Sequence, residues 1–435
     1  MLSFTAENVR SYSGEVHLSL LGTRLASPGV VRDLEIAGSL TPVKVLPVAG
    51  VFGANASGKS TLLRAMADMR DVVLNSFRRG DSEARIERYP FLLGGTEKHP
   101  SRFAIELVLG GVRWQYGYAV DDSHVLEEYA YHFPRGRQAL VFRRDRATGV
   151  ISFGPPFRSA RRTLAPLMRN NTLLLSVAGA ADDKLIGPLF AWFRRNLALM
   201  EPSNRAPRIA ATASLVQSSE TRSRVIALLK AADLGISGLE RFQPELEPGE
   251  AERIRRAMGI LMNDEDAASD IDVEQIKGVL IRLHHMGRHG PIAIEPDQES
   301  QGTQVWLGMV GPVLGALSVG YAILADELDT SLHPHLVQEI VSLFRDRETN
   351  PHCAQLIFNA HDTSILGNGS RRTLGRDQVW FTEKDVSGST SLYPLSDFRP
   401  KNDEAVERRY LQGRYGGTPV LDTAGFRRAV EQARK

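Results

Sequence analysis

Residues 53–61 of this chain read Gly53-Ala54-Asn55-Ala56-Ser57-Gly58-Lys59-Ser60-Thr61, which fits the phosphate-binding P-loop pattern G-x-x-x-x-G-K-[ST]. An apolar run typical of a strand precedes this stretch at residues 45–52, and an amphipathic run typical of a helix follows at residues 60–66. The glycines let the backbone wrap around a polyphosphate, and Lys59 brings a positive charge. Ser60 offers a hydroxyl to Mg²⁺. This context favours a nucleoside triphosphate site over an accidental glycine-rich turn.

The composition is that of an ordinary globular protein. The chain has 435 residues, of which 42% are hydrophobic and 24% are charged, enough for one large core or for two to three domains. Its net charge of +2 is nearly neutral, so the chain as a whole has no basic footprint for nucleic acid. The single cysteine, Cys353, excludes an internal disulfide and a multi-cysteine zinc site.

The sequence contains no run of about 20 apolar residues that could span a membrane. Residues 1–8 also lack the basic and then apolar order of a signal peptide. We therefore expect a cytoplasmic protein without a membrane span.

A strand-rich region is followed by a helical one. Alternating apolar residues predict strands at residues 103–109, 112–118, 125–133 and 138–143. Apolar periodicity predicts helices at residues 185–193, 222–230 and 250–262, and a strand pattern returns at residues 278–285.

A second motif lies far downstream, where the apolar run at residues 320–325 ends in Asp326 and Glu327, the Walker B pattern. In P-loop sheets ligands gather at the carboxyl edge of the strands, which is where these acids would lie. Asp326 would hold Mg²⁺ through water, and Glu327 would polarise the attacking water. An apolar run before Asp-Glu is by itself often only a strand-to-loop boundary, but the P-loop in the same chain favours a nucleotide site.

The spacing between the two motifs indicates a large insertion, because 273 residues (326 − 53) separate Gly53 from Asp326. Ser300-Gln301-Gly302-Thr303 opens an apolar helix predicted at residues 305–317, ahead of Asp326. Asp329 follows Glu327 in the stretch Leu328-Asp329-Thr330, and His361 follows a strand predicted at residues 355–359. Taken alone, the serine is a helix N-cap and the histidine a structural residue at a strand end. Their order around the Asp-Glu pair favours functional roles.

This order of P-loop, serine–glycine signature, Asp-Glu, Leu-Asp and strand–histidine resembles the ABC-type ATPase family. The resemblance implies a site that works as a dimer and takes ATP and Mg²⁺. It assigns the nucleotide to Gly53, Asn55, Ala56, Ser57, Gly58, Lys59, Ser60 and Thr61 of one subunit, with Ser60 and Asp326 holding the metal. Ser300 and Gly302 of the other subunit would cap the γ-phosphate, and Asp329 would lie at the seam. Glu327 and His361 would be catalytic.

A closer resemblance covers nearly the whole chain. It rests on Asn8-Val9-Arg10-Ser11-Tyr12, on the P-loop wording, on residues 326–334, and on Val379-Trp380-Phe381-Thr382-Glu383-Lys384-Asp385, Tyr393-Pro394-Leu395-Ser396-Asp397-Phe398 and Tyr410-Leu411-Gln412-Gly413-Arg414-Tyr415-Gly416. Together these resemble the RloA-like ATP-binding proteins of bacterial abortive-infection modules, relatives of SMC, RecF and OLD ATPases. The resemblance implies an anti-phage defence ATPase that forms a homodimer or higher oligomer. It would control a separate effector, often a TOPRIM nuclease from a neighbouring gene.

The fold class we expect is α/β, an ABC-type P-loop head with a mixed sheet, an antiparallel β subdomain and a helical insertion. The expected boundaries are residues 1–157 for the N-terminal half of the head, 158–277 for the mostly helical insertion and 278–435 for the C-terminal half.

Several points stay open. Residues 78–100 contain no glutamine for the usual magnesium-linking loop, although Pro90-Phe91 fits that loop. Only 74 residues (435 − 361) follow His361, too few for a TOPRIM domain of roughly 100 residues. The acids at residues 264–266 and 270–272 and the arginine clusters are most simply solvated. A DNA-repair ATPase of the RecF or SMC kind, acting on nucleic acid, is the alternative function, whereas the 273-residue spacing argues against a transporter nucleotide-binding subunit. Turnover in this class is usually slow, so a nucleotide-binding switch with little hydrolysis also stays open.

Overall fold

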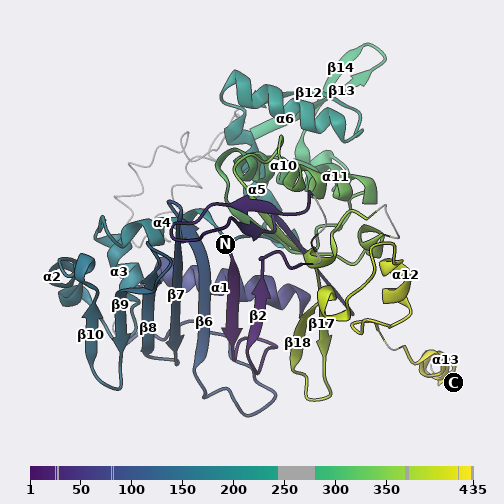
Figure 1. Ribbon diagram of the computed structural model, residues 1–435. Helices are drawn as coiled ribbons and strands as arrows, with labels where there is room; N and C mark the ends of the chain where they lie inside the picture. The colour runs from purple at the N-terminus through teal and green to yellow at the C-terminus, as the bar shows by residue number, and fades with distance from the viewer. Residues whose placement is uncertain are drawn as a thin grey trace. The chain divides into compact units, whose positions relative to one another are not determined.

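The computed structural model describes residues 1–432 except residues 25, 27–28, 80, 82, 243–279, 368–371 and 420. The chain forms two compact units (Figure 1). The first consists of Met1–Met200, Ala316–Asp329 and His333–Lys435, and the second of Glu201–Gly315 and Thr330–Leu332. The helix predicted at residues 250–262 and the acids at residues 264–266 and 270–272 lie outside the described residues.

A six-stranded sheet forms the centre of the first unit. Its strand order is β11 (Ala198–Met200), β15 (Ala322–Ala325), β16 (Gln355–Asn359), β5 (Val48–Gly53), β17 (Val379–Lys384) and β18 (Thr390–Pro394). All neighbours pair in parallel except β17 and β18, which form an antiparallel hairpin. Every residue of β15 and β16 is buried, as expected for strands covered on both faces.

Helix α1 (Lys59–Asn75) follows β5 after five loop residues. Its apolar residues recur at helical spacing, and Leu62, Met66 and Met69 are fully buried. Helix α11 (Pro334–Arg345) follows β15 and packs against β5 and β16. The strand, glycine loop and helix predicted around residue 53 are therefore present.

A second, antiparallel sheet of seven strands completes the first unit. Its order is β10 (Val150–Phe153), β9 (Ala139–Asp145), β8 (Val125–His132), β7 (Val112–Val120), β6 (Ser101–Leu109), β1 (Ser3–Glu7) and β2 (Val16–Ser19), and Figure 1 shows these strands side by side. Gly110 and Gly111 join β6 to β7 with φ values of 55° and 75°, a conformation that favours glycine. Residues of this sheet, of α1 and of the parallel sheet share one hydrophobic core. The predicted α/β class, a P-loop head with an antiparallel subdomain, is confirmed.

Smaller elements surround these two sheets. They are β3 (Arg32–Leu34), β4 (Val43–Val45), α2 (Ala160–Leu164), α3 (Leu174–Ala180), α4 (Gly187–Arg195), α12 (Val406–Leu411) and α13 (Thr423–Gln432).

The second unit contains helices and a small sheet. Its helices are α5 (Arg205–Leu215), α6 (Ser219–Ala231) and most of α10 (Gln301–Val319), and its strands are β12 (Ile236–Phe242), β13 (Leu280–Gly287) and β14 (Gly290–Ile294). Two strands, β11 of the first unit and β12 of the second, lie within residues 158–277, where the sequence pattern predicted a mostly helical insertion and no strands. The three residues of β11 are too few to show a period, and β12 contains a bulge between Ile236 and Gly238 that breaks its alternation.

Among the described helices, α10 is the one whose length and composition would suffice to cross a membrane. Half of that stretch is buried inside the protein, as in the core helix of a globular domain. Its apolar character is therefore weak evidence for a membrane span.

Candidate nucleotide-binding site

The P-loop is fully formed between β5 and α1. Gly58 has a φ of 104°, and a side chain there would collide with Thr390, whose Oγ1 would lie 2.6 Å from the added Cβ. Lys59 Nζ donates to the carbonyl oxygens of Gly53 at 2.8 Å and Ala54 at 3.0 Å, so the lysine folds back over the loop. Burial lowers the pKa of Lys59, and the carboxylates of Asp329, Glu327 and Asp326 oppose that shift. The ammonium therefore bonds the loop itself, and the three acids act on it electrostatically.

Asp326 is buried at the end of β15 and is joined to the P-loop through Asn359. The amide Nδ2 of Asn359 donates to Asp326 Oδ1 at 2.5 Å and to Ser60 Oγ at 3.3 Å. Its Oδ1 accepts the backbone N–H of Glu327 at 2.6 Å. The amide of Asn359, itself fully buried, therefore connects both predicted magnesium ligands and the residue predicted to activate water.

Glu327 and His361 face each other across the end of the sheet. His361 Nε2 lies 3.9 Å from Glu327 Oε1, and both side chains are partly exposed. Glu327 has a φ of 55°, a left-handed conformation that costs on the order of 1 kcal/mol or more in a residue with a side chain. The hydrogen bond from its N–H to Asn359 helps to hold this conformation. The two groups are placed so that a water molecule could contact both.

Asp329 organises the segment that carries His361. Its Oδ2 accepts the backbone N–H groups of His361 at 2.8 Å and of Asp362 at 2.6 Å. This carboxylate therefore fixes the position of His361 within one chain. The expectation that Asp329 lies at a subunit seam stays a prediction.

The P-loop, Glu327 and His361 line one cavity of about 440 Å³ in the first unit. The lining residues are Asn55, Ala56, Gly58, Lys59, Ser60, Thr61, Glu327, His361 and Lys384. The volume is within the range of ligand pockets, roughly 300–1,000 Å³. The cavity therefore brings together the glycine loop, Glu327 and His361 that the sequence analysis selected, with Asp326 adjacent.

The residues present fit a magnesium ion that is bound together with a nucleotide. Among the described residues, no group of three or more histidines, cysteines or acids could form a metal cage. Ser60 and Asp326 supply one hydroxyl and one carboxylate, bridged by Asn359. Mg²⁺ takes its remaining ligands from phosphates and water in such sites, so a sparse protein contribution is the expected one.

The serine–glycine signature belongs to the second unit. Ser300 Oγ accepts the backbone N–H of Thr303 at 3.2 Å and so caps the first turn of α10. A side chain at Gly302 would meet the carbonyl oxygen of Ser331 at 2.7 Å, so glycine is required there. The cap is compatible with either a structural or a phosphate-binding role, because N–H groups at a helix N-terminus serve both.

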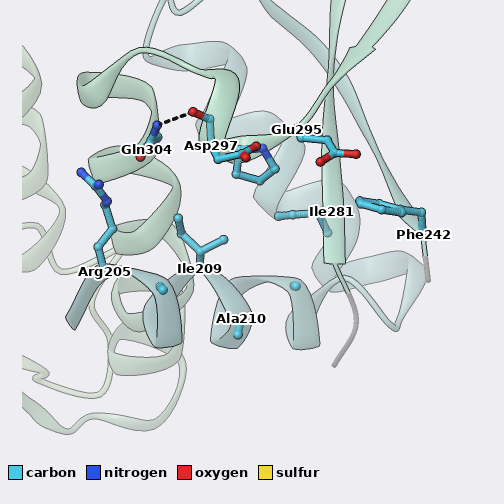
Figure 2. Close-up of a pocket in the computed structure, with 11 residues that line it drawn as sticks. Arg205, Ile209, Ala210, Phe242, Ile281, Glu295, Asp297 and Gln304 are labelled. Atoms are coloured by element: carbon cyan, nitrogen blue, oxygen red, sulfur yellow. Dashed lines mark hydrogen bonds between the residues drawn. The ribbon is translucent and has the colours of Figure 1, made fainter. Parts of the chain in front are cut away.

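A second cavity, of about 370 Å³, lies in the second unit (Figure 2). It is mainly apolar, with Ile209 and Ala210 of α5 on one side and Phe242 and Ile281 of β12 and β13 on the other, as Figure 2 shows. The described residues that line it include no glycine loop and no lysine. We therefore assign the nucleotide to the cavity in the first unit.

Part of the basic cluster at residues 282–289 contacts neighbouring acids. Arg282 Nη2 lies 2.8 Å from Glu295 Oε1, and His285 Nε2 lies 2.7 Å from Glu299 Oε1. The guanidinium of Arg282 also stacks on a phenyl ring, that of Phe242. These contacts favour a structural role for Arg282 and His285 over phosphate binding.

Sequence reasoning missed three residues around the nucleotide site: Asn359, Thr382 and Lys384. Thr382 is fully buried, and its Oγ1 lies 2.6 Å from the P-loop hydroxyl of Ser57. The sequence gives only a weak indication of their role. Asn359 ends the strand before His361, and Thr382 follows a short apolar run. Only the strand order places both strands beside β5.

Comparison with known proteins gives a family and a set of distant structures. Residues 48–367 match the family described as "AAA domain, putative AbiEii toxin, Type IV TA system". No curated protein matches the sequence. Solved structures that match are an Smc head bound to the C-winged helix domain of ScpA, the SMC head domain from Thermotoga maritima, and the Smc head domain with an extended coiled coil bound to the C-terminal domain of ScpA derived from Pyrococcus furiosus.

Each of these structures is 12% identical to the chain, with TM-scores of 0.44, 0.40 and 0.40. The matches cover 91%, 90% and 91% of this chain and 98%, 98% and 97% of the other. The family match is the informative comparison, because it spans β5, the P-loop, the Asp-Glu pair and His361. The chain belongs to this AAA-domain P-loop family.

Proposed function

We propose that this chain is an ATPase of the ABC type that hydrolyses ATP slowly. The observation that carries the proposal is that the P-loop, Glu327 and His361 line the same cavity. The buried amide of Asn359 also donates hydrogen bonds to both Asp326 and Ser60. Such an arrangement suits phosphoryl transfer to water, where catalysis consists mainly of positioning and of charge stabilisation.

The roles of the residues follow from their positions. The backbone N–H groups of the P-loop and the ammonium of Lys59 would bind the phosphates of the nucleotide, and Ser60 and Asp326 would hold Mg²⁺, which would supply positive charge to the phosphates. Glu327 accepts the proton of the attacking water, and His361 orients that water toward the γ-phosphate. Because Asp329 fixes the backbone of His361, it acts as a positioning residue.

The proposed active assembly is a dimer or higher oligomer of this chain. In the dimer, Ser300 and Gly302 of one copy complete the site of the other by presenting the N-terminus of α10 to the γ-phosphate. The order of motifs along the chain supports this arrangement. ATP would favour the engaged state and hydrolysis would release it.

The proposed biological role is regulation of a cytoplasmic anti-phage defence module. Support comes from the resemblance to RloA-like proteins and from the matching family, whose description names an AbiEii toxin of a type IV toxin–antitoxin system. In this role the chain controls a separate effector from a neighbouring gene, and a TOPRIM nuclease is the effector we expect. The competing role is DNA repair of the RecF or SMC kind.

Affinity capture of the Glu327→Gln variant with ATP·Mg²⁺ tests this role. The variant is expressed with its native gene neighbourhood, and the eluate is analysed for protein and nucleic acid. A stoichiometric nuclease-like partner supports effector control, and Lys59→Ala should lose that partner because it no longer binds nucleotide. Nucleic acid without a protein partner would instead favour the DNA-repair role.

A further inference from the structure

Lys384 lines the nucleotide cavity but belongs to none of the motifs described above. It is the last residue of β17, whereas the other lining residues come from the P-loop, Glu327 and His361. Among the described residues that line the cavity, Lys59 and Lys384 are the two cations. The position of Lys384 therefore calls for a physical explanation.

The register of the parallel sheet aims Lys384 toward the P-loop. β17 pairs with β5 so that Thr382 lies opposite Gly53, the first residue of the loop. The side chain of Thr382 reaches Ser57 inside the loop at 2.6 Å. Because side chains two residues apart in a strand point to the same face, Lys384 extends over the loop on the same side as Thr382.

The backbone of Lys384 is fixed, whereas its side chain has no partner. In the hairpin Lys384 pairs with Thr390, whose backbone N–H donates to the carbonyl oxygen of Ser11 at 2.8 Å. Thr390 also packs directly against Gly58 of the P-loop. The ammonium of Lys384 is exposed and makes no hydrogen bond or ion pair with any other residue that the structure describes.

The negative charges of the acids and of a bound triphosphate favour a second cation in the cavity. Lys59 is already bonded to two carbonyl oxygens, at 2.8 Å and 3.0 Å. A triphosphate would add several negative charges to an edge of the sheet that already holds Asp326, Glu327 and Asp329. Arg64 lies 3.7 Å from Asp326 but does not line the cavity. We propose that Lys384 is a second positively charged ligand of the nucleotide polyphosphate. This inference rests on the proposed function, since it assumes that the cavity binds ATP.

Nucleotide titrations of three variants test the proposal. The probes are N-methylanthraniloyl-ATP and N-methylanthraniloyl-ADP with Mg²⁺, titrated at several salt concentrations. Lys384→Ala should weaken binding about tenfold and reduce its salt dependence, because one charge-assisted contact is lost. Lys384→Arg should recover most of the affinity. Lys401→Ala, which removes an exposed lysine that does not line the cavity, should bind as the unchanged chain does.

The results distinguish this inference from the proposed function. Weaker binding of both nucleotides would place Lys384 on the α- or β-phosphate, and weaker binding of ATP alone would place it on the γ-phosphate. Equal affinity of Lys384→Ala and the unchanged chain would overturn the inference and leave the proposed function intact. Failure of the unchanged chain to bind either nucleotide would overturn both. Unfolding of Lys384→Ala without nucleotide should match that of the unchanged chain, because its side chain has no partner to lose.

Discussion

Replacing Asn359 with alanine should separate the chemistry of the site from the stability of the fold. The substitution removes three hydrogen bonds at once, to Asp326, to Ser60 and from the backbone of Glu327. Because Asn359 is fully buried, the groups that it bonds would be left away from bulk water. The carboxylate of Asp326 and the N–H of Glu327 would each lose a partner.

The expected loss of unfolding free energy follows from these contacts. A hydrogen bond to the charged Asp326 contributes about 2 kcal/mol and the bond from the Glu327 backbone about 1 kcal/mol, while the 3.3 Å contact with Ser60 adds little. The loss should therefore be about 3 kcal/mol. Hydrolysis of ATP by the folded variant should fall by about tenfold to a hundredfold, as is usual when a group that orients a metal ligand is removed.

Asn350→Ala provides a matched control in the same unit. Asn350 is also a buried asparagine with three hydrogen bonds. Its Nδ2 donates to the carbonyl oxygens of Phe344 and Ala354, and its Oδ1 accepts the backbone N–H of Ala354. Its loss should cost a similar unfolding free energy but leave the nucleotide site intact. Urea unfolding gives the stability of both variants, and ATP hydrolysis is then compared under conditions in which both are folded. If Asn359→Ala hydrolyses ATP as fast as Asn350→Ala does, the role given to Asn359 is wrong.

Two further predictions concern His361 and Glu128. His361→Ala should bind ATP normally but hydrolyse it about tenfold to a hundredfold more slowly, because the group 3.9 Å from Glu327 no longer orients the water; single-turnover measurements would show this. Burial raises the pKa of Glu128 above its ordinary value of 4.5, against the pull of the N–H groups of Leu175 and Leu174. Its contribution to stability is then present below that ordinary value and is lost as the pH rises through the folded-state pKa. Glu128→Gln should therefore lose less unfolding free energy between mildly acidic and neutral pH than the unchanged chain, and parallel pH dependences of the two would contradict this.

The parts of the fold that sequence could predict are those whose chemistry leaves few alternatives. Gly58 must be glycine because it combines a φ of 104° with contact against Thr390. The fully buried strand β15 reads as a continuous apolar run that ends at two acids, and β16 has the apolar residues 356–358 between Gln355 and Asn359. Local pattern and tertiary role agree at these positions, so the sequence suffices.

Other parts depend on contacts between distant residues that no local pattern encodes. Ser57 and Thr382 are 325 residues apart in sequence yet share a hydrogen bond, because β17 enters the sheet next to β5. The loop at residues 91–99 likewise takes its shape from Asn8, whose side chain bonds the backbone of Phe91, Thr96 and His99. Residues 78–100 contain no glutamine of the magnesium-linking kind, so the sequence did not predict how this loop is organised.

The C-terminal aromatic residues show how a resemblance acquires a physical meaning. The rings of Tyr410 and Tyr415 stack on Phe381, with ring centroids 5.2 Å and 5.7 Å apart. Phe381 lies opposite Phe52 in the sheet, directly before the P-loop. These tyrosines therefore support the strand that carries Thr382 and Lys384, which the sequence could not reveal.

The most direct test of the central claim is ATP turnover by Glu327→Gln alongside its affinity for ATP·Mg²⁺. If the cavity between the P-loop and β15 is the hydrolytic site, the variant should bind ATP about as tightly as the unchanged chain. It should turn ATP over about a hundredfold more slowly or worse, because the amide cannot accept the proton of the attacking water. Hydrolysis at the rate of the unchanged chain would contradict the account.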